Sequence, residues 1–205
     1  MKKINREKFY DKYPFRPLKQ PQVDNLNFLL DKLDASVLLT RLSEYAYVLA
    51  TLKLETADTF APVKEAHWIK PESRRIAVLK KMYAGRKSII HSSGKLYYGR
   101  GYVQLTHIDN YVKMNPYVQK IFPDYSANGG LVENPELACE PETAWIILEI
   151  GMSKGLFTGK KLAHYLTDKK IDFYNARKII NGLDRAGLVQ AYAEKYWEIL
   201  EFKEG

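Results

Sequence analysis

Apolar residues recur at helical spacing through residues 36–55, and this feature constrains the fold more than any other in the chain. The segment SVLLTRLSEYAYVLATLKLE places on one helical side Val37, Leu38, Leu42, Tyr45, Leu49 and Leu52. Ser36 is the expected N-cap of this helix. The sequence ADTFAPV then predicts a break, because Pro62 cannot continue a helix.

Similar patterns predict further helices along the chain. They cover residues 21–33, 73–84, 106–115, 141–155, 172–180 and 185–201. Residues 85–101 carry glycines among β-branched and aromatic residues, which predicts a short hairpin or an extended arm. Residues 115–135 are expected to be mostly loop. The predicted fold class is therefore mainly α with one small β element.

The length and composition fit an ordinary globular protein. The 205 residues suit one large domain or two small lobes, and hydrophobic and charged residues make up 46% and 27% of the chain. The basic N-terminus is not followed by the apolar stretch of a signal peptide, and no run of 18 apolar residues predicts a membrane span. We therefore expect synthesis in the cytoplasm without a signal peptide. A monomer is expected.

Cysteine and histidine usage argues against a disulfide and a metal centre. Cys139 is the single cysteine, and its neighbours PELACEPE offer no ligand partner, so we expect a half-buried structural thiol. The histidines lack the spacing of an HExxH-type zinc site; they are His67, His91, His107 and His164. We expect neither a metal nor a cofactor.

The formal net charge of +8 is unevenly distributed. Residues 1–20 hold seven Lys and Arg against two acidic residues, a net charge of +5. Such a basic N-terminal arm favours anionic polymers of a cell envelope, although general solubility explains the charge as well. Packing of Phe9, Tyr10 and Tyr13 on the rest of the protein is the competing interpretation. No nucleic-acid-binding motif accompanies the charge, so we expect no specific nucleic-acid partner.

Two glutamates near the end of the 36–55 helix are candidates for acid–base chemistry. Glu55 lies at the expected C-terminal end of an apolar helix, where the helix dipole and the low dielectric both favour the neutral form that a general acid needs. Glu65 follows after a break that lets the chain turn back, toward the separation of roughly 6.5–9.5 Å found in inverting glycosidases. The spacing also fits a helix-capping Glu55 and a solvated surface Glu65.

The segment YYGRGYVQLTHIDNY, residues 97–111, combines glycines and aromatics with neutral hydrogen-bonding side chains. Gly99 and Gly101 allow the backbone to approach another group closely. The polar positions that can face one side together are Gln104, Thr106 and Asn110. Amides and hydroxyls suit a neutral, hydroxyl-rich ligand such as an amino sugar, and no phosphate-binding loop pattern is present. A structural turn is the alternative interpretation.

Four blocks of sequence, in this order, resemble the chitinase-like domains of glycoside hydrolase family 19. They are AYVLATLKLETADTFAPVKEA, YYGRGYVQLTHIDNY, NPELACEPETAWIILEIGMSKGLFTGKKL and ARKIINGLDRAGL, and the resemblance covers roughly residues 20–195. The string Gly-Arg-Gly-aromatic-aliphatic-Gln-Leu-Thr is its most specific part. The chain looks most similar to the bacteriophage and prophage endolysins of this family.

The resemblance implies a lysozyme-like fold with a cleft between two lobes, in which residues 21–205 form a single catalytic domain after the basic arm. It assigns the general acid to Glu55, the carboxylate that activates water to Glu65, and the hydroxyl that helps to hold this water to Thr106. The substrate-binding residues that we expect are Gln104, Asn110, Asn181, Arg100, Tyr111, His107 and Trp68. The ETGG turn of the family reads ETAD here, so Ala57 and Asp58 replace glycines, and Asp58 is an alternative second carboxylate.

The implied reaction is hydrolysis of β-1,4 bonds between amino sugars, with inversion at the anomeric carbon. Peptidoglycan is the expected substrate, so we expect an endolysin-type lysozyme that reaches the cell wall after a holin opens the membrane. Chitin is the alternative substrate. A non-catalytic wall-binding or virion-associated module on the same fold is a further alternative, and a nucleic-acid binder is supported by the charge alone.

Overall fold

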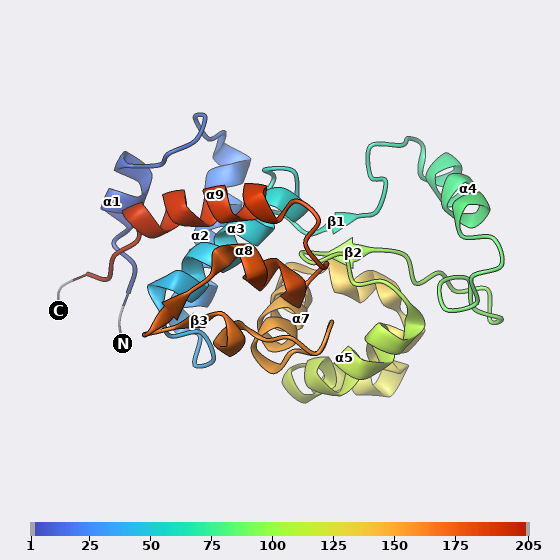
Figure 1. Ribbon diagram of the computed structural model, residues 1–205. Coiled ribbons are helices and arrows are strands. Elements are labelled where there is room, and N and C mark those ends of the chain that lie inside the picture. Colours follow the sequence, from blue (N-terminus) through green and yellow to red (C-terminus); the bar gives the residue numbers. More distant parts are fainter. Residues whose placement is uncertain (1–2, 204–205) are drawn as a thin grey trace. The chain divides into compact units, whose positions relative to one another are not determined.

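The computed structural model describes residues 3–203, which divide into two compact units (Figure 1). Unit 1 is formed by residues 3–60 and 149–203, and unit 2 by residues 61–148. Helices predominate in both units, so the prediction of a mainly α fold is confirmed. Within residues 3–203, no helix combines the length and the apolar character needed to cross a membrane.

Unit 1 is helical, with one short hairpin. Its helices are α1 (Arg6–Asp11), α2 (Gln20–Ala35), α3 (Leu42–Glu55), α8 (Phe173–Ala176) and α9 (Ala186–Ile199), with 3₁₀ turns η3 (Leu162–His164) and η4 (Arg177–Ile179). Strands β3 (Leu166–Thr167) and β4 (Lys170–Ile171) pair antiparallel. Figure 1 shows α3 and α9 side by side, and α8 also packs against α9. The 172–180 prediction therefore corresponds to two short turns of helix.

Helix α3 lies in the core of unit 1. Residues 45–50 are all buried, which leaves no polar face toward solvent in this part of the helix. Helix α9 presents the buried side chains Ala186, Val189, Ala193 and Tyr196 at intervals of three or four residues. This spacing is the one from which the sequence predicted helix 185–201.

The first residues of unit 1 pack on its core and do not form a separate arm. Phe9 is fully buried and stacks on Tyr196 of α9, with ring centroids 6.2 Å apart. Tyr13 and Phe15 contact the same ring at 6.2 and 5.1 Å. The prediction of a basic arm outside the core is therefore wrong, because the aromatic residues between its cations bury themselves against α9.

Ser36 does not cap α3, and this part of the sequence prediction is wrong. The Ser36 hydroxyl oxygen instead accepts the N–H groups of Leu38 at 3.2 Å and Leu39 at 2.9 Å, which holds a turn after α2. Helix α3 begins only at Leu42. Its N-terminus is capped by the Glu44 side chain, which accepts the Arg41 N–H at 3.0 Å.

Unit 2 combines a two-stranded ribbon with helices. Its elements are β1 (Val63–Lys64), α4 (Glu72–Met82), β2 (Arg100–Gly101), α5 (Ile108–Ile121), η1 (Pro123–Asn128), α6 (Gly130–Glu133) and η2 (Pro135–Cys139), and α7 (Pro141–Lys154) leads from unit 2 into unit 1. Strands β1 and β2 are antiparallel, with Val63 opposite Gly101 and Lys64 opposite Arg100. Within residues 85–101, Ile90 and Leu96 form a single antiparallel bridge, so the predicted hairpin is present in a minimal form.

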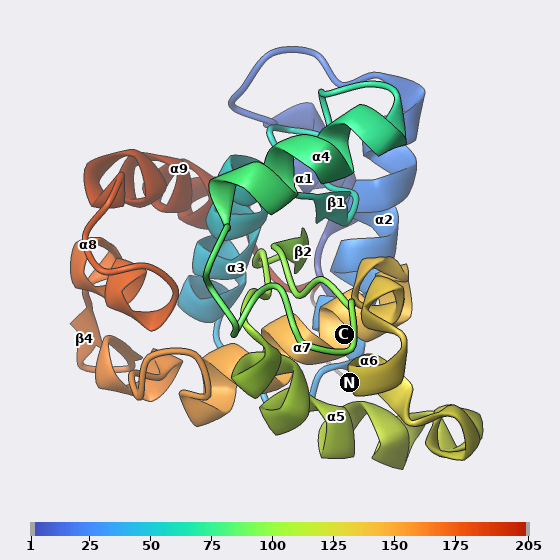
Figure 2. The ribbon, with the colours of Figure 1, turned by 90° about the vertical axis from the view of Figure 1, so that its right-hand side faces the viewer.

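The expected loop over residues 115–135 is largely helical, so this prediction is wrong. Helix α5 continues through Pro116 to Ile121, because Met114 and Val118 are buried and α5 packs against α6 (Figure 2). Pro116 and Val112 are both exposed, so the hydrogen bond that proline removes lies on the solvent side of the helix. Asn115 joins the two helices by accepting the Leu131 N–H at 2.7 Å.

Candidate functional site

Glu65 follows β1 in unit 2 and is held by neutral donors at both carboxylate oxygens. The Gly99 N–H donates to Oε2 at 2.8 Å, and the Tyr83 hydroxyl donates to Oε1 at 2.5 Å. The Glu65 backbone N–H also donates to the Gly99 carbonyl at 2.8 Å. Glu65 is half-buried. The interpretation of Glu65 as a solvated surface residue is therefore wrong.

The hydroxyl of Tyr83 is a permanent donor in this pair. Burial raises the pKa of Tyr83 to about 12, and the hydrogen bond to the Glu65 carboxylate acts in the same direction. Tyr83 therefore stays protonated at neutral pH and keeps donating to Glu65. Sequence reasoning missed Tyr83, since a tyrosine at the end of a basic helix carries no motif.

Two polar side chains lie close to Gly99. A Cβ at this position would lie 2.8 Å from Oε1 of Gln104 and 3.3 Å from Oε2 of Glu65. The Gln104 amide in turn donates to the Val63 carbonyl at 3.0 Å, and its backbone adopts a left-handed φ of 52°. The predicted close approach at Gly99 is confirmed, and its partners are side chains of the same unit.

Hydrogen bonds link the predicted polar positions of the 97–111 segment. The Thr106 hydroxyl donates to the Gln104 carbonyl at 2.7 Å, and the Asn110 amide donates to the Thr106 carbonyl at 2.8 Å. His107, which precedes α5 with a φ of 72°, lies with Nδ1 2.9 Å from the Ser88 hydroxyl. Gln104, Thr106, His107 and Asn110 are all half-buried. The structure therefore brings these four residues together around the turn that leads into α5.

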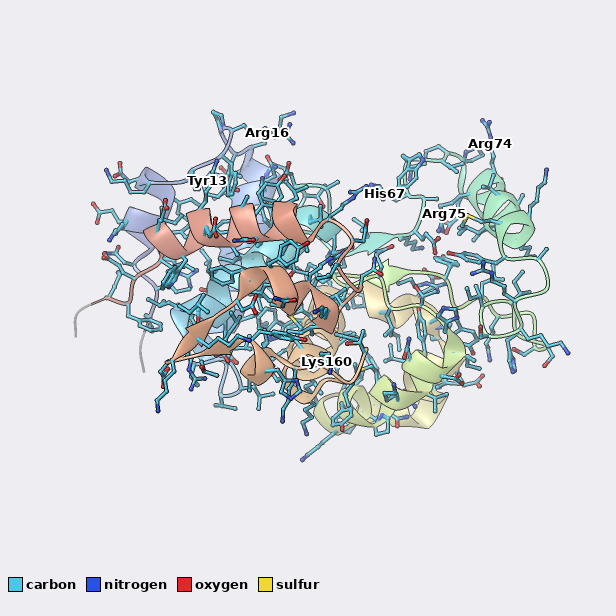
Figure 3. All side chains as sticks on the ribbon, viewed as in Figure 1. Tyr13, Arg16, His67, Arg74, Arg75 and Lys160 are labelled. Atoms are coloured by element: carbon cyan, nitrogen blue, oxygen red, sulfur yellow. The ribbon has the colours of Figure 1, made fainter. Side chains whose placement is uncertain are left out.

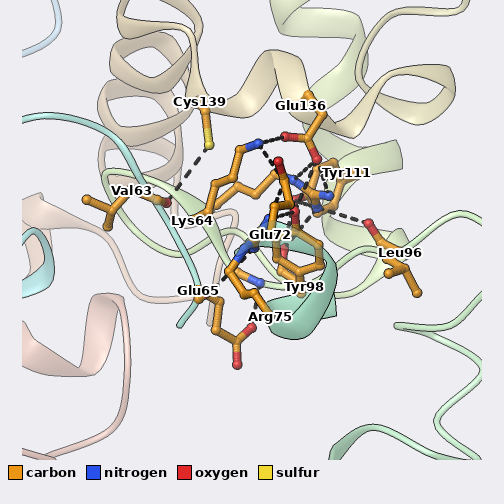
Figure 4. A network of polar contacts seen from close by, with 12 residues as sticks. Val63, Lys64, Glu65, Glu72, Arg75, Leu96, Tyr98, Tyr111, Glu136 and Cys139 are labelled. Atoms are coloured by element: carbon orange, nitrogen blue, oxygen red, sulfur yellow. Dashed lines mark hydrogen bonds and ion pairs between the residues drawn. The ribbon is translucent and has the colours of Figure 1, made fainter. Parts of the chain in front are cut away.

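Arg100 and Tyr111 do not present their side chains to a ligand. Arg100 is 3% exposed and Tyr111 is fully buried, and a hydrogen bond of 3.1 Å joins them. Arg100 also binds Glu136 at 2.6 Å and lies over the Tyr98 ring, in the network of Figure 4. Lys64 completes this network through a 2.6 Å ion pair with Glu136. Burial contradicts direct substrate contact, and both side chains instead support the ribbon that precedes Glu65.

Trp68 is the most exposed aromatic side chain near Glu65 in sequence. Its exposed fraction is 72%, and the ring of His67 meets it edge-on at 5.4 Å. An indole in this setting has a free face on which an apolar or sugar surface can stack. Its accessibility is compatible with the substrate-binding role expected of Trp68.

Glu55 ends α3 in unit 1 and is paired with a buried cation. The Arg177 guanidinium donates to Oε1 of Glu55 at 2.6 Å, and the side chain of Arg177 is 2% exposed and that of Glu55 17%. Arg177 also donates to the Asp184 carbonyl at 2.9 Å, so it is fixed on both sides. The sequence reasoning did not include this ion pair. The only local signal for Arg177 is its place between the buried Ala176 and Ile179.

The turn after Glu55 keeps a backbone conformation that favours glycine. Ala57 and Asp58 have φ values of 50° and 68°, in the left-handed region. Asp58 forms ion pairs with Lys53 and with Arg16, the latter at 3.0 Å. These two cations occupy the Asp58 carboxylate, which argues against Asp58 as the second catalytic group. Asn181, in the same unit, is exposed after η4.

The remaining candidates carry no site. Cys139 is half-buried, as expected, and burial raises the pKa of its thiol. In the part of the chain that the structure describes, no three His, Cys, Asp or Glu side chains gather in a way that could hold a metal ion.

Comparisons with protein-family models and with curated proteins found no match to this chain.

Proposed function

We propose that this protein is a glycoside hydrolase that cleaves β-1,4 bonds between the amino sugars of peptidoglycan, in the manner of an endolysin-type lysozyme. The setting of Glu65 carries the proposal, because its two oxygens are oriented by Gly99 and Tyr83. Both donors are neutral, so they fix the carboxylate without cancelling its charge. An oriented, ionised carboxylate is the group that water activation requires.

Thr106 supports the same chemistry. Its hydroxyl gives its single hydrogen to the Gln104 carbonyl, which leaves the oxygen lone pairs free to accept a hydrogen bond from water. In the proposed reaction this water loses a proton to Glu65, and its oxygen bonds to the anomeric carbon. Glu55 protonates the leaving oxygen as the glycosidic bond breaks, and the anomeric centre is inverted. No cofactor takes part.

The supporting residues also suit a sugar polymer. Asn110 and Gln104 are neutral, and Trp68 offers an exposed ring. In this proposal the protein is made in the host cytoplasm and reaches the wall after a holin-type pore opens the membrane.

Release of reducing ends from purified peptidoglycan and from glycol chitin tests the function. Glu65→Gln should lower turnover on peptidoglycan by about 10²–10⁴-fold, the range for loss of an acid or base catalyst. Glu140→Gln, which changes an exposed carboxylate of the same unit, is the matched control and should retain full turnover. NMR of the first product should show the inverted anomer.

The alternatives give different results in the same assay. Cleavage of glycol chitin without cleavage of peptidoglycan would identify a chitinase. Sedimentation with walls and no new reducing ends from either polymer would identify a non-catalytic binding module, and the hydrolase proposal would then fail.

A further inference from the structure

Positive charge is concentrated in residues 67–87 of unit 2, a segment made of α4 and its flanks. It holds seven Lys and Arg against the single acid Glu72, a net charge of +6 in a chain whose total is +8. Residues 1–20 carry a net charge of +5. The largest local excess of positive charge therefore lies beside the Glu65 segment.

The two basic segments differ in how their charges are neutralised. Near the N-terminus, Arg6, Lys8 and Arg16 each form ion pairs with acids of unit 1. In the 67–87 segment, Arg75 is buried and binds Glu72 at 2.6 Å. The other six cations of this segment are exposed and make no ion pair with any residue in 3–203; they are Lys70, Arg74, Lys80, Lys81, Arg86 and Lys87. We call these six residues the α4 cationic face.

Helix geometry keeps the cationic charge of α4 on the solvent side. Arg74, Val78 and Lys81 recur at intervals of four and three residues, so they lie on one side of α4, and all three are exposed. Arg75 and Leu79 belong to the buried side, and Leu79 packs with Ile89 in the core of unit 2. Figure 3 shows Arg74 pointing away from the unit, whereas Arg75 points back toward it.

We propose that the α4 cationic face binds linear phosphodiester polymers attached to the cell wall, of the teichoic-acid type. Repeated phosphates match a group of exposed cations that have no acidic partner within residues 3–203, and binding releases counterions from the polymer. The choice of a wall polymer as target rests on the proposed function.

A lipid surface suits this helix less well than a polymer. An interfacial helix inserts a free apolar face into the bilayer, but the apolar face of α4 is already used for packing in unit 2. Only two large apolar side chains of α4 are exposed, Val78 at 40% and Met82 at 53%.

Sedimentation of the 205-residue protein with purified walls tests this proposal, because it measures binding and not catalysis. The face variant carries three substitutions in the α4 cationic face, Arg74→Gln, Lys80→Gln and Lys81→Gln. The control removes the same charge from exposed positions of unit 1, by Lys160→Gln, Lys161→Gln and Lys169→Gln. At low ionic strength we expect the face variant to bind native walls about tenfold more weakly than the control does, because it lacks three weak surface contacts. The difference should vanish at high salt and on walls stripped of phosphodiester polymer.

Three results would overturn the proposal. They are equal binding of the face variant and the control, a loss of binding that persists on stripped walls, and face-dependent binding to duplex DNA without binding to walls. Cleavage of soluble glycan fragments is measured in parallel. Full activity of Glu65→Gln on these fragments would contradict the proposed function, and the binding result would still stand.

Discussion

The Tyr83 hydroxyl and Oε1 of Glu65 are joined by a hydrogen bond of 2.5 Å across 18 positions of sequence. Tyr83 is the residue directly after α4, and its ring packs against the core cluster that contains Leu79 and Ile89. The helix therefore fixes the Glu65 carboxylate from outside the segment that carries it. Tyr83 acts as a positioning residue in the proposed reaction.

Tyr83→Phe should lower kcat on peptidoglycan by about two- to tenfold with little change in KM. The variant removes the hydrogen bond to Oε1 of Glu65 and keeps the ring in place, while the Gly99 N–H still holds Oε2. Steady-state kinetics and a melting curve check this prediction. Tyr174→Phe, at an exposed position, is the control for the loss of a hydroxyl. A rise in KM at constant kcat would show that Tyr83 acts in substrate binding and not on the carboxylate.

Glu55→Gln should lower stability as well as activity. The substitution replaces a charge-assisted hydrogen bond to the buried Arg177 by a neutral one, which is expected to cost about 1–3 kcal/mol. Urea unfolding measures the loss, and activity must then be compared well below the melting temperature. Glu198→Gln, an exposed change in the same unit, should leave stability within about 0.5 kcal/mol of wild type. Unchanged stability of Glu55→Gln would contradict the importance of this ion pair.

Thr106→Ala and Glu65→Gln should be less than additive in their effects on kcat. Both residues are proposed to hold the same water, so removing the second group costs less once the first is absent. A double-mutant cycle on purified peptidoglycan measures the coupling. Fully additive losses would indicate that the two side chains serve separate steps.

Ala57→Gly should stabilise the protein by about 0.5–1 kcal/mol. Ala57 has a φ of 50°, a conformation that is costly for alanine and free of strain for glycine. The expected rise in Tm is about 2–4 °C per kcal/mol for a chain of this size. Ala77→Gly, in the exposed interior of α4, is the opposite control and should destabilise the protein by a similar amount. A lower Tm for Ala57→Gly would show that the turn does not carry this strain.

Stability should fall at acidic pH partly through Glu136. Burial raises the pKa of Glu136, but the hydrogen bond from Lys64 and the charge of Arg100 outweigh burial and hold the pKa below its usual 4.5. A lowered pKa in the folded state stabilises the fold above about pH 4.5, and this contribution is lost as the pH falls through the folded value. Urea unfolding between pH 3 and 7 should therefore show a shallower acid loss for Glu136→Gln, together with lower stability at neutral pH. Parallel curves for the two proteins would contradict this role.

The sequence alone determined most of the helical framework. The spacing of apolar residues predicted α2, α7 and α9 to within two residues at each end, because side chains three or four positions apart share one face of a helix. A close approach at Gly99 was also expected because glycine permits it, and one of the groups near it, Gln104, belongs to the same segment. These features are local, and local sequence is sufficient to encode them.

Only the tertiary structure decided which side chains meet. Arg177 pairs with Glu55 across 122 positions, and Tyr83 reaches Glu65 from the end of another helix. The same packing buried Arg100 and Tyr111, which the sequence had placed at the substrate, and drew the N-terminal aromatic residues onto α9. A periodic pattern predicts the face of a helix on which a residue lies. Which other side chains contact that face depends on burial and on the pairing of charges over the whole unit.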